Sequence, residues 1–138
     1  MSKIDFYTED CTFTYKGKIN TRNWINRAIT EADKKTGAIS IIFCSDDYLI
    51  NINREYLNHD YFTDIITFDY CEEDIISGDL FISIDMVKSN AEKFGVSFYE
   101  ELHRVVIHGV LHLIGFKDKS NEEAQIMRSQ ETYWLERY

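Results

Sequence analysis

Strands and helices are expected in different parts of this sequence, and this segregation limits the fold more than any other feature does. From Asp85 to the C-terminus, the apolar residues recur at helical spacing. Three helices are predicted there: residues 85–94, a segment capped by Ser97 that continues to about Leu113, and residues 122–136 capped by Asn121. All strand signals precede them. A chain in which strands come first and helices come last favours the α+β class.

The first part of the chain contains the strand signals and two further helices. Runs rich in β-branched and aromatic residues predict edge strands at 4–7 and 12–15, a strand at 38–44, and a hairpin-like pair at 64–69 and 76–84. One helix is predicted to start at Asn20 or Thr21 and to be ended by Gly37. Another is capped by Ser45 and runs to about Leu57. Together these elements predict a mixed sheet of four to five strands covered by helices.

One domain spanning residues 1–138 is expected, because a hydrophobic content of 44% suits a single buried core. The chain has no proline, only six glycines and no repeat, so nothing marks a linker. No apolar run approaches the roughly 18 residues that a membrane span needs, and the N-terminal residues are largely polar. Neither export nor membrane insertion is therefore expected.

The three cysteines, Cys11, Cys44 and Cys71, are widely spaced and form no C-x-x-C pair. An odd number in this arrangement indicates neither a disulfide framework nor a thiolate zinc site. We expect reduced and mostly buried thiols.

The charge of the chain limits its partners. Twenty-four acidic residues against 15 basic ones give a formal net charge of −9. Such a charge opposes indiscriminate binding to nucleic acid backbones. Binding of a nucleic acid would then depend on a confined cationic cleft.

His108 and His112 stand one helical turn apart in an apolar helix, so their imidazoles project from one face toward a common point. Gly115 follows where a left-handed residue would end the helix, and Asp118 comes within reach of the same point. The pattern H-x-x-x-H-x-x-G-x-x-D supplies two nitrogens and one carboxylate and leaves a fourth position for water, as catalytic zinc sites do. We therefore predict one zinc ion per chain, held by His108, His112 and Asp118.

Gly109 occupies the position at which the metallopeptidase signature H-E-x-x-H has its general base, so a peptidase of that type is disfavoured. Two explanations for this glycine stay open. It either lets a neighbouring element or a substrate approach the helix, or it is a tight packing glycine. His59 and His103 are candidates for proton transfer, but the pattern identifies no general base, and the catalytic residues other than the ligands are unknown.

The segment 108–116, H-G-V-L-H-L-I-G-F, resembles the signature of the YbeY family, bacterial endoribonucleases that act in ribosomal RNA maturation. Further blocks resemble the family in the same order and extend the likeness over most of residues 45–137: 52–56, 60–68, 78–83, and Met127, Glu131 and Leu135 at spacings of four. The resemblance implies a zinc-dependent endoribonuclease that cleaves single-stranded RNA in ribosomal RNA maturation and ribosome quality control. It also implies association with the small ribosomal subunit and a cytoplasmic location.

Two positions depart from the family pattern. The family usually ends its motif in Asp-His, whereas the same positions here are Lys117 and Asp118, so a carboxylate takes the place of the third imidazole. The resemblance also implies an arginine used in RNA handling at the position of Leu57, so that phosphate-binding guanidinium is missing here. The candidates for a substitute cation are Arg54, His59, Lys88, Arg104 and Lys117.

Two alternatives to the endoribonuclease stay open from the sequence. One is a ribosome-associated binding factor without catalysis, in which the metal only fixes the loop after Gly115. The other is a small-molecule metallohydrolase that acts on an amide or ester.

Overall fold

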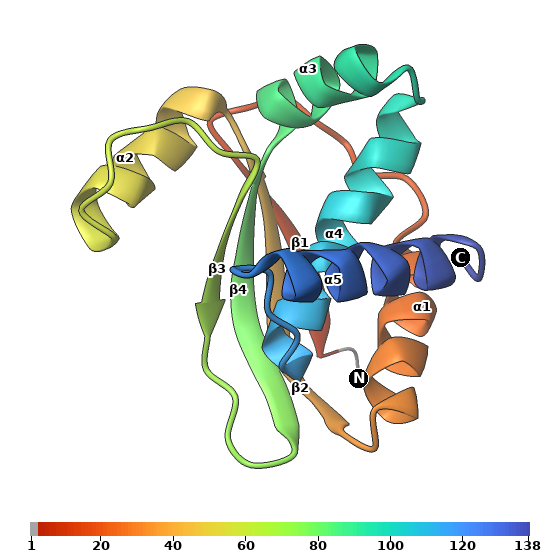
Figure 1. Cartoon of the computed structure of the whole chain (residues 1–138). Helices are drawn as coiled ribbons and strands as arrows, with labels where there is room; N and C mark the ends of the chain where they lie inside the picture. The colour runs from red at the N-terminus through yellow and green to blue at the C-terminus, as the bar shows by residue number, and fades with distance from the viewer. Residues whose placement is uncertain (1–2) are drawn as a thin grey trace.

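A four-stranded sheet of order β1-β2-β4-β3 forms the centre of the structure, a computed structural model that describes residues 3–138 (Figure 1). Met1 and Ser2 of the predicted domain lie outside the described residues. The elements are β1 Ile4–Glu9, α1 Lys18–Glu31, β2 Lys35–Cys44, α2 Asp46–Tyr56, β3 Ile65–Asp69, β4 Ile75–Ser83, α3 Ile84–Phe94, α4 Phe98–Ile114 and α5 Asn121–Leu135. The strands β1, β2 and β4 are parallel, and β3 pairs with β4 in the antiparallel direction. The predicted α+β class with a mixed sheet is confirmed.

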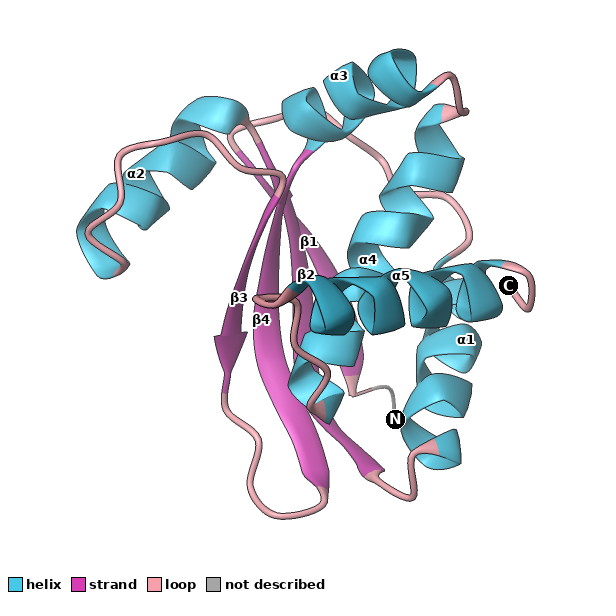
Figure 2. Ribbon diagram, in the orientation of Figure 1, coloured by secondary structure: helices cyan, strands magenta, loops and turns pink. Residues whose placement is uncertain are grey.

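The helices cover the sheet unequally. Figure 2 shows α1, α4 and α5 on one side of the sheet and α2 on the other. The larger apolar cluster lies under the three helices and joins Trp24 of α1 and Val106 of α4 to Ile41 of β2. A smaller cluster lies under α2 and joins Leu49 to Cys44. Because both of its faces are covered, β2 is apolar over most of its length, which is why residues 38–44 gave a strong strand signal.

Serine side chains cap four of the helices. The predicted caps Ser45 and Ser97 are confirmed, since each accepts a hydrogen bond from the backbone N–H three residues ahead. Ser83 caps α3 in the same way. The prediction that Asn121 caps the last helix was wrong by one residue. Ser120 is the cap, because it forms a reciprocal capping box with Glu123.

The predicted strand at 12–15 is absent from the described structure, in which this segment is a loop. Its alternating pattern has another cause: Phe13 and Tyr15 both pack on Phe43 of β2, with ring centroids 5.2 and 5.1 Å away. The two aromatic side chains thus anchor an irregular segment on the sheet without strand pairing.

The limits of the first helix also differ from the prediction. It starts at Lys18 after Gly17, whose φ is 91°, and Thr21 is buried in the first turn, where it hydrogen-bonds Tyr138. Gly37 does not end the helix. It lies inside β2, where a Cβ would collide with the Ser77 hydroxyl of β4, so its role is the close approach of two strands.

All three cysteines are free, with Cys44 buried and the other two half-buried. Burial raises the pKa of the Cys44 thiol to about 12. Among the described residues, no helix is long and apolar enough to cross a membrane.

Candidate metal centre

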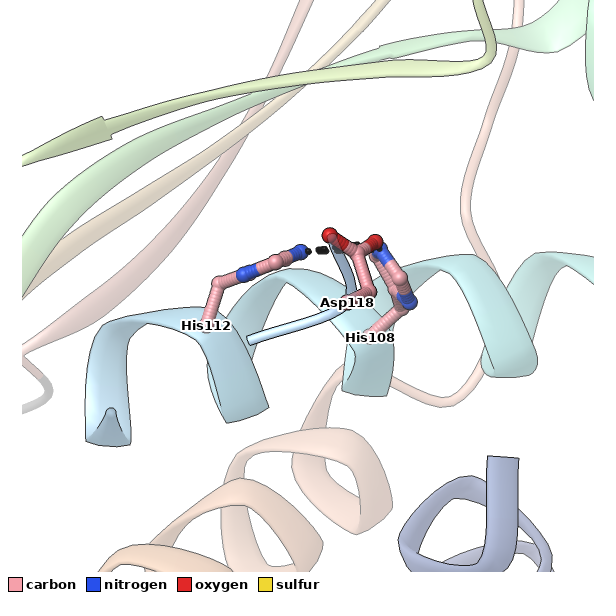
Figure 3. A group of neighbouring side chains, drawn as sticks. All are labelled: His108, His112 and Asp118. Atoms are coloured by element: carbon pink, nitrogen blue, oxygen red, sulfur yellow. Dashed lines mark hydrogen bonds and ion pairs between the residues drawn. The ribbon is translucent and has the colours of Figure 1, made fainter. Parts of the chain in front are cut away.

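The three predicted ligands meet at one point. His108 and His112 project from the same face of α4, and their Nε2 atoms lie 3.1 Å apart (Figure 3). The Oδ2 atom of Asp118 lies 3.3 Å from His112 Nε2 and 3.4 Å from His108 Nε2. Ligand atoms on a tetrahedral zinc ion, with bonds near 2.1 Å, are about 3.4 Å apart. The three side chains therefore form a group that could hold a metal ion, and the donor set fits zinc.

The loop after α4 brings Asp118 to this point. Gly115 ends the helix with a φ of 128°, a conformation that favours glycine, and its N–H donates to the carbonyl of Leu111. Ser120 caps α5 five residues after Gly115, so the loop is fixed at both ends. The predicted helix end at Gly115 is thus confirmed, and the turn folds the carboxylate back over the two imidazoles.

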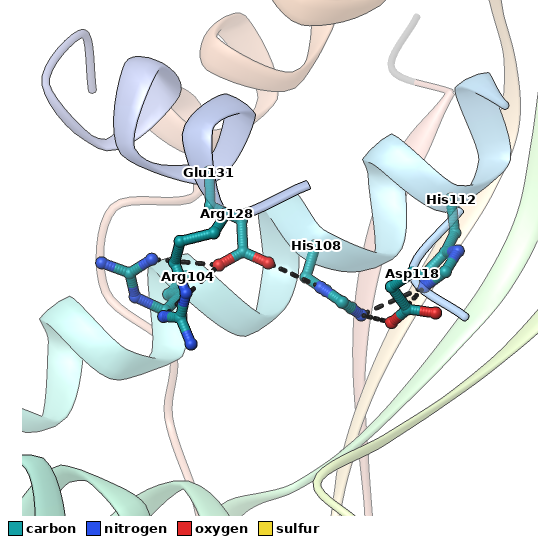
Figure 4. A network of polar contacts seen from close by, with 6 residues as sticks. All are labelled: Arg104, His108, His112, Asp118, Arg128 and Glu131. Carbon is teal, nitrogen blue, oxygen red and sulfur yellow. Dashed lines mark hydrogen bonds and ion pairs between the residues drawn. The ribbon is translucent and has the colours of Figure 1, made fainter. Parts of the chain in front are cut away.

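Glu131 supports His108 from the other side (Figure 4). The Nδ1 atom of His108 lies 2.6 Å from Glu131 Oε2, while Oε1 accepts a hydrogen bond from Arg104 at 3.0 Å. Arg128 adds a weaker ion pair at 3.8 Å. When Nδ1–H donates to a carboxylate, the ring orientation is fixed and the Nε2 lone pair is left for a metal. No separate role for Glu131 could be predicted from the sequence, because nothing local shows that a residue 23 positions away faces His108.

The charges around His108 favour a cation at this point. Burial alone would lower the pKa of His108, but Glu131, Asp118 and Asp64 raise it. Burial would raise the pKa of Glu131, whereas the hydrogen bonds from His108 and Arg104 hold it below its usual value. Glu131 is therefore ionised at neutral pH, and such a charge would make the Nε2 atom of His108 a stronger donor to a metal ion.

His108, His112 and Asp118 together form the candidate metal group. This metal group lies in a hollow of about 540 Å³. The wall opposite the histidines consists of β3 and the loop after α2, and the lining residues are Asn53, Leu57, Tyr61, Thr63, Asp64, Ile65, Ile66, Thr67, Asp69, His108, His112, Leu113 and Asp118. None of these described residues is a lysine or arginine. The cationic cleft expected beside the metal is thus absent from this hollow as described.

A second hollow, of about 280 Å³, lies on the other side of His108 and shares Asp64 and His108 with the first. It contains Arg104 and Arg128. Of the other candidate cations, Arg54 is paired with Asp60, and neither Lys88 nor Lys117 lines either hollow. The cations that line the second hollow, Arg104 and Arg128, are therefore both paired with Glu131.

Gly109 is a packing glycine. A Cβ at this position would lie 2.8 Å from Ile65 Cδ1 and 2.9 Å from Leu80 Cδ2, both in the sheet. The glycine lets α4 approach β3 and β4, so the element that comes close to the helix at this position is the sheet. Because this position is a glycine, the chain lacks the general base of an H-E-x-x-H peptidase here.

The two histidines considered for proton transfer lie outside both hollows. His103 packs among aromatic rings, and its ring is stacked on Tyr138 with centroids 4.0 Å apart. Its Nε2 atom is buried and has no hydrogen-bond partner in the described part of the chain. Burial lowers the pKa of His103 to about 4. His59 instead contacts Tyr61, 3.0 Å from Nδ1 to the hydroxyl.

Replacing His103 by phenylalanine is expected to flatten the pH dependence of stability. The pKa of about 4 lies below the usual value of 6.5, so between these limits the unfolded state takes up a proton that the folded state does not. The contribution of His103 to the free energy of unfolding of the wild type is therefore fully present above pH 6.5. It is lost as the pH drops toward 4, which lowers the free energy of unfolding by roughly 3 kcal/mol at most. Urea unfolding of both proteins from pH 7 to 4.5 measures the difference, with His59→Phe as control. If the free energies of unfolding of wild type and His103→Phe changed in parallel with pH, His103 would not be the cause of the pH dependence.

The sequence model described as Endoribonuclease YbeY matches residues 4–138. The chain belongs to the YbeY family. Among its YbeY relatives, the Endoribonuclease YbeY of Bacteroides thetaiotaomicron is 48% identical over 128 residues, which cover 93% of each chain. The Endoribonuclease YbeY of Phocaeicola vulgatus is 52% identical, again over 93% of each chain. The likeness predicted from residues 108–116 is confirmed and covers almost the whole chain.

The fold is similar to a solved structure as well. The solution structure of TM1509 from Thermotoga maritima superposes with a TM-score of 0.68 and 28% sequence identity. The alignment covers 96% of this YbeY chain and 87% of the other. The arrangement of helices around the mixed sheet is thus shared over nearly the full length.

Proposed function

We propose that this protein is a zinc-dependent endoribonuclease that cuts single-stranded RNA in ribosomal RNA maturation. One observation carries the proposal: His108, His112 and Asp118 converge in a hollow of a chain whose relatives are named Endoribonuclease YbeY. The three residues are the proposed ligands of one zinc ion. The family membership supports RNA as the substrate.

The side chains around the proposed ion have different roles. Zinc in such a site lowers the pKa of a bound water to near neutrality and polarises a phosphoryl oxygen. Glu131 holds the His108 ring in place, and Asp118 completes the donor set from a loop fixed at both ends. Gly109 keeps α4 close to β3, so the histidines face the wall of the hollow. These residues position the reaction without themselves attacking RNA.

The wider role follows from the family. We propose that ribosomal RNA is the substrate, that the small ribosomal subunit is the partner, and that the protein acts in the cytoplasm and in ribosome quality control. We also propose that residues 1–138 work as one endoribonuclease domain. The family match over residues 4–138 supports this extent.

A cleavage assay tests the function. The zinc-loaded protein and a chelator-stripped sample are incubated with an RNA that contains both duplex and single-stranded regions. Cleavage is expected only with metal and only in the single-stranded regions, and a His112→Ala protein purified in parallel controls for contaminating nucleases. RNA that is bound but uncut in both samples would favour the non-catalytic binding factor. Turnover of a small ester or amide without RNA cleavage would favour the metallohydrolase.

A further inference from the structure

The hollow around the metal group offers RNA one exposed aromatic side chain, that of Tyr61. Tyr61 and Leu57 both line it, and they are 53% and 41% exposed. Its described lining has three carboxylates and no lysine or arginine. An RNA strand in this hollow cannot be bound mainly through its phosphates, so its bases must supply much of the contact.

The Tyr61 ring is held in place by its neighbours. It stacks on the His59 ring with centroids 5.2 Å apart and an interplanar angle of 24°. The buried Asn53 of α2 donates a hydrogen bond from its side-chain N–H to the backbone carbonyl of Tyr61 at 2.9 Å. The backbone carbonyl of Asn53 accepts a hydrogen bond from the backbone N–H of His59 at 3.0 Å. The loop is thus tied to α2, while half of the Tyr61 side chain remains in contact with solvent.

We propose that Tyr61 is a stacking platform for an unpaired RNA base, which places the adjoining phosphodiester over His108, His112 and Asp118. The inference rests on the proposed endoribonuclease function and adds to it a base-binding subsite. An aromatic ring fixed on one side and exposed on the other binds a base through its face and needs no charge.

Two features of the chain agree with this subsite. A base inside a duplex has both faces covered, so a stacking platform selects single-stranded regions. Leu57 adds apolar surface to the same hollow. A stacking contact is also not opposed by a net charge of −9.

Kinetics on a short single-stranded RNA test the subsite. Tyr61→Ala is expected to raise KM by about 10- to 100-fold, the range of one base-stacking contact, while kcat changes little. Tyr61→Phe and Tyr61→Trp should keep KM near the wild-type value, because they keep an aromatic face. Phe62→Ala is the matched control, since Phe62 is 54% exposed in the same loop but does not line the hollow. Zinc content is measured in every variant and should not change.

An RNA scanned with single abasic nucleotides locates the stacked base. Wild type should lose affinity at one position near the cut, and Tyr61→Ala should be insensitive to the same change. If wild type cuts RNA and Tyr61→Ala has the same KM, the platform is overturned while the nuclease stands. If Tyr61→Phe loses as much as Tyr61→Ala, the hydroxyl matters and stacking is overturned. A wild-type protein that neither binds nor cuts RNA would overturn the proposed function and the platform together.

Discussion

The His112→Ala variant is expected to bind zinc at least about 100-fold more weakly than wild type and to lose RNA cleavage. Structural sites with four ligands bind zinc with roughly 10–16 kcal/mol, so one ligand contributes about 3 kcal/mol, or about 100-fold. His112 lies on α4 with 30% of its side chain exposed, and its ring contacts His108 and Asp118. Its loss should therefore spare the core. Competition against a chromophoric chelator measures the affinity.

The order of zinc affinities among Asp118 variants tests whether Asp118 is the third ligand. Asp118→Ala should lower zinc affinity to a similar degree, whereas Asp118→His should retain or raise it by restoring the usual family ligand. Lys119→Ala in the same loop is the control and should bind zinc as wild type does. Urea unfolding of the metal-free proteins should not separate the variants, because the carboxylate is exposed at a turn. An Asp118→Ala protein with wild-type affinity would show that Asp118 is not a ligand.

The local part of the fold could be predicted from the sequence, and the long-range part could not. Helical and strand periodicities gave the types of β2, α2, β3, β4 and the last three helices correctly, because each signal is contained within a few residues. The capping error arose because Ser120 and Asn121 are both good caps, and only the contact with Glu123 decides between them. The strand order β1-β2-β4-β3 depends on contacts between distant segments, which periodicity does not report.

In the candidate site, too, the local part could be predicted from the sequence and the long-range part could not. The three proposed ligands lie within eleven residues of one another, so their spacing alone predicted that they would meet. Gly109 could not be interpreted without the side chains of Ile65 and Leu80 on the sheet. The residues that the sequence missed, Glu131 and Tyr61, reach the site from α5 and from the loop after α2.

Glu131→Gln is expected to weaken zinc binding by about 10- to 100-fold, the usual effect of losing a carboxylate behind a metal-binding histidine. The amide keeps the size of the side chain but removes the charge that fixes His108 Nδ1–H and strengthens Nε2 as a ligand. The same change should lower the free energy of unfolding. Glu131 has only 7% of its side chain exposed, and Arg104, 23% exposed, loses its partner, so a cost of about 1–3 kcal/mol follows after allowance for solvent.

Replacing Arg104 by methionine separates the two effects. This change breaks the ion pair but leaves the hydrogen bond between Glu131 and His108, which lie 2.6 Å apart. Arg104→Met should therefore lose stability yet bind zinc much more tightly than Glu131→Gln does. If the two variants bind zinc equally, Glu131 acts only as a partner of the arginines. If Glu131→Gln binds zinc as wild type does, the carboxylate does not position His108. The expected ordering can arise only when the contact between Glu131 and His108 itself controls the ligand, since both variants share the loss of the ion pair.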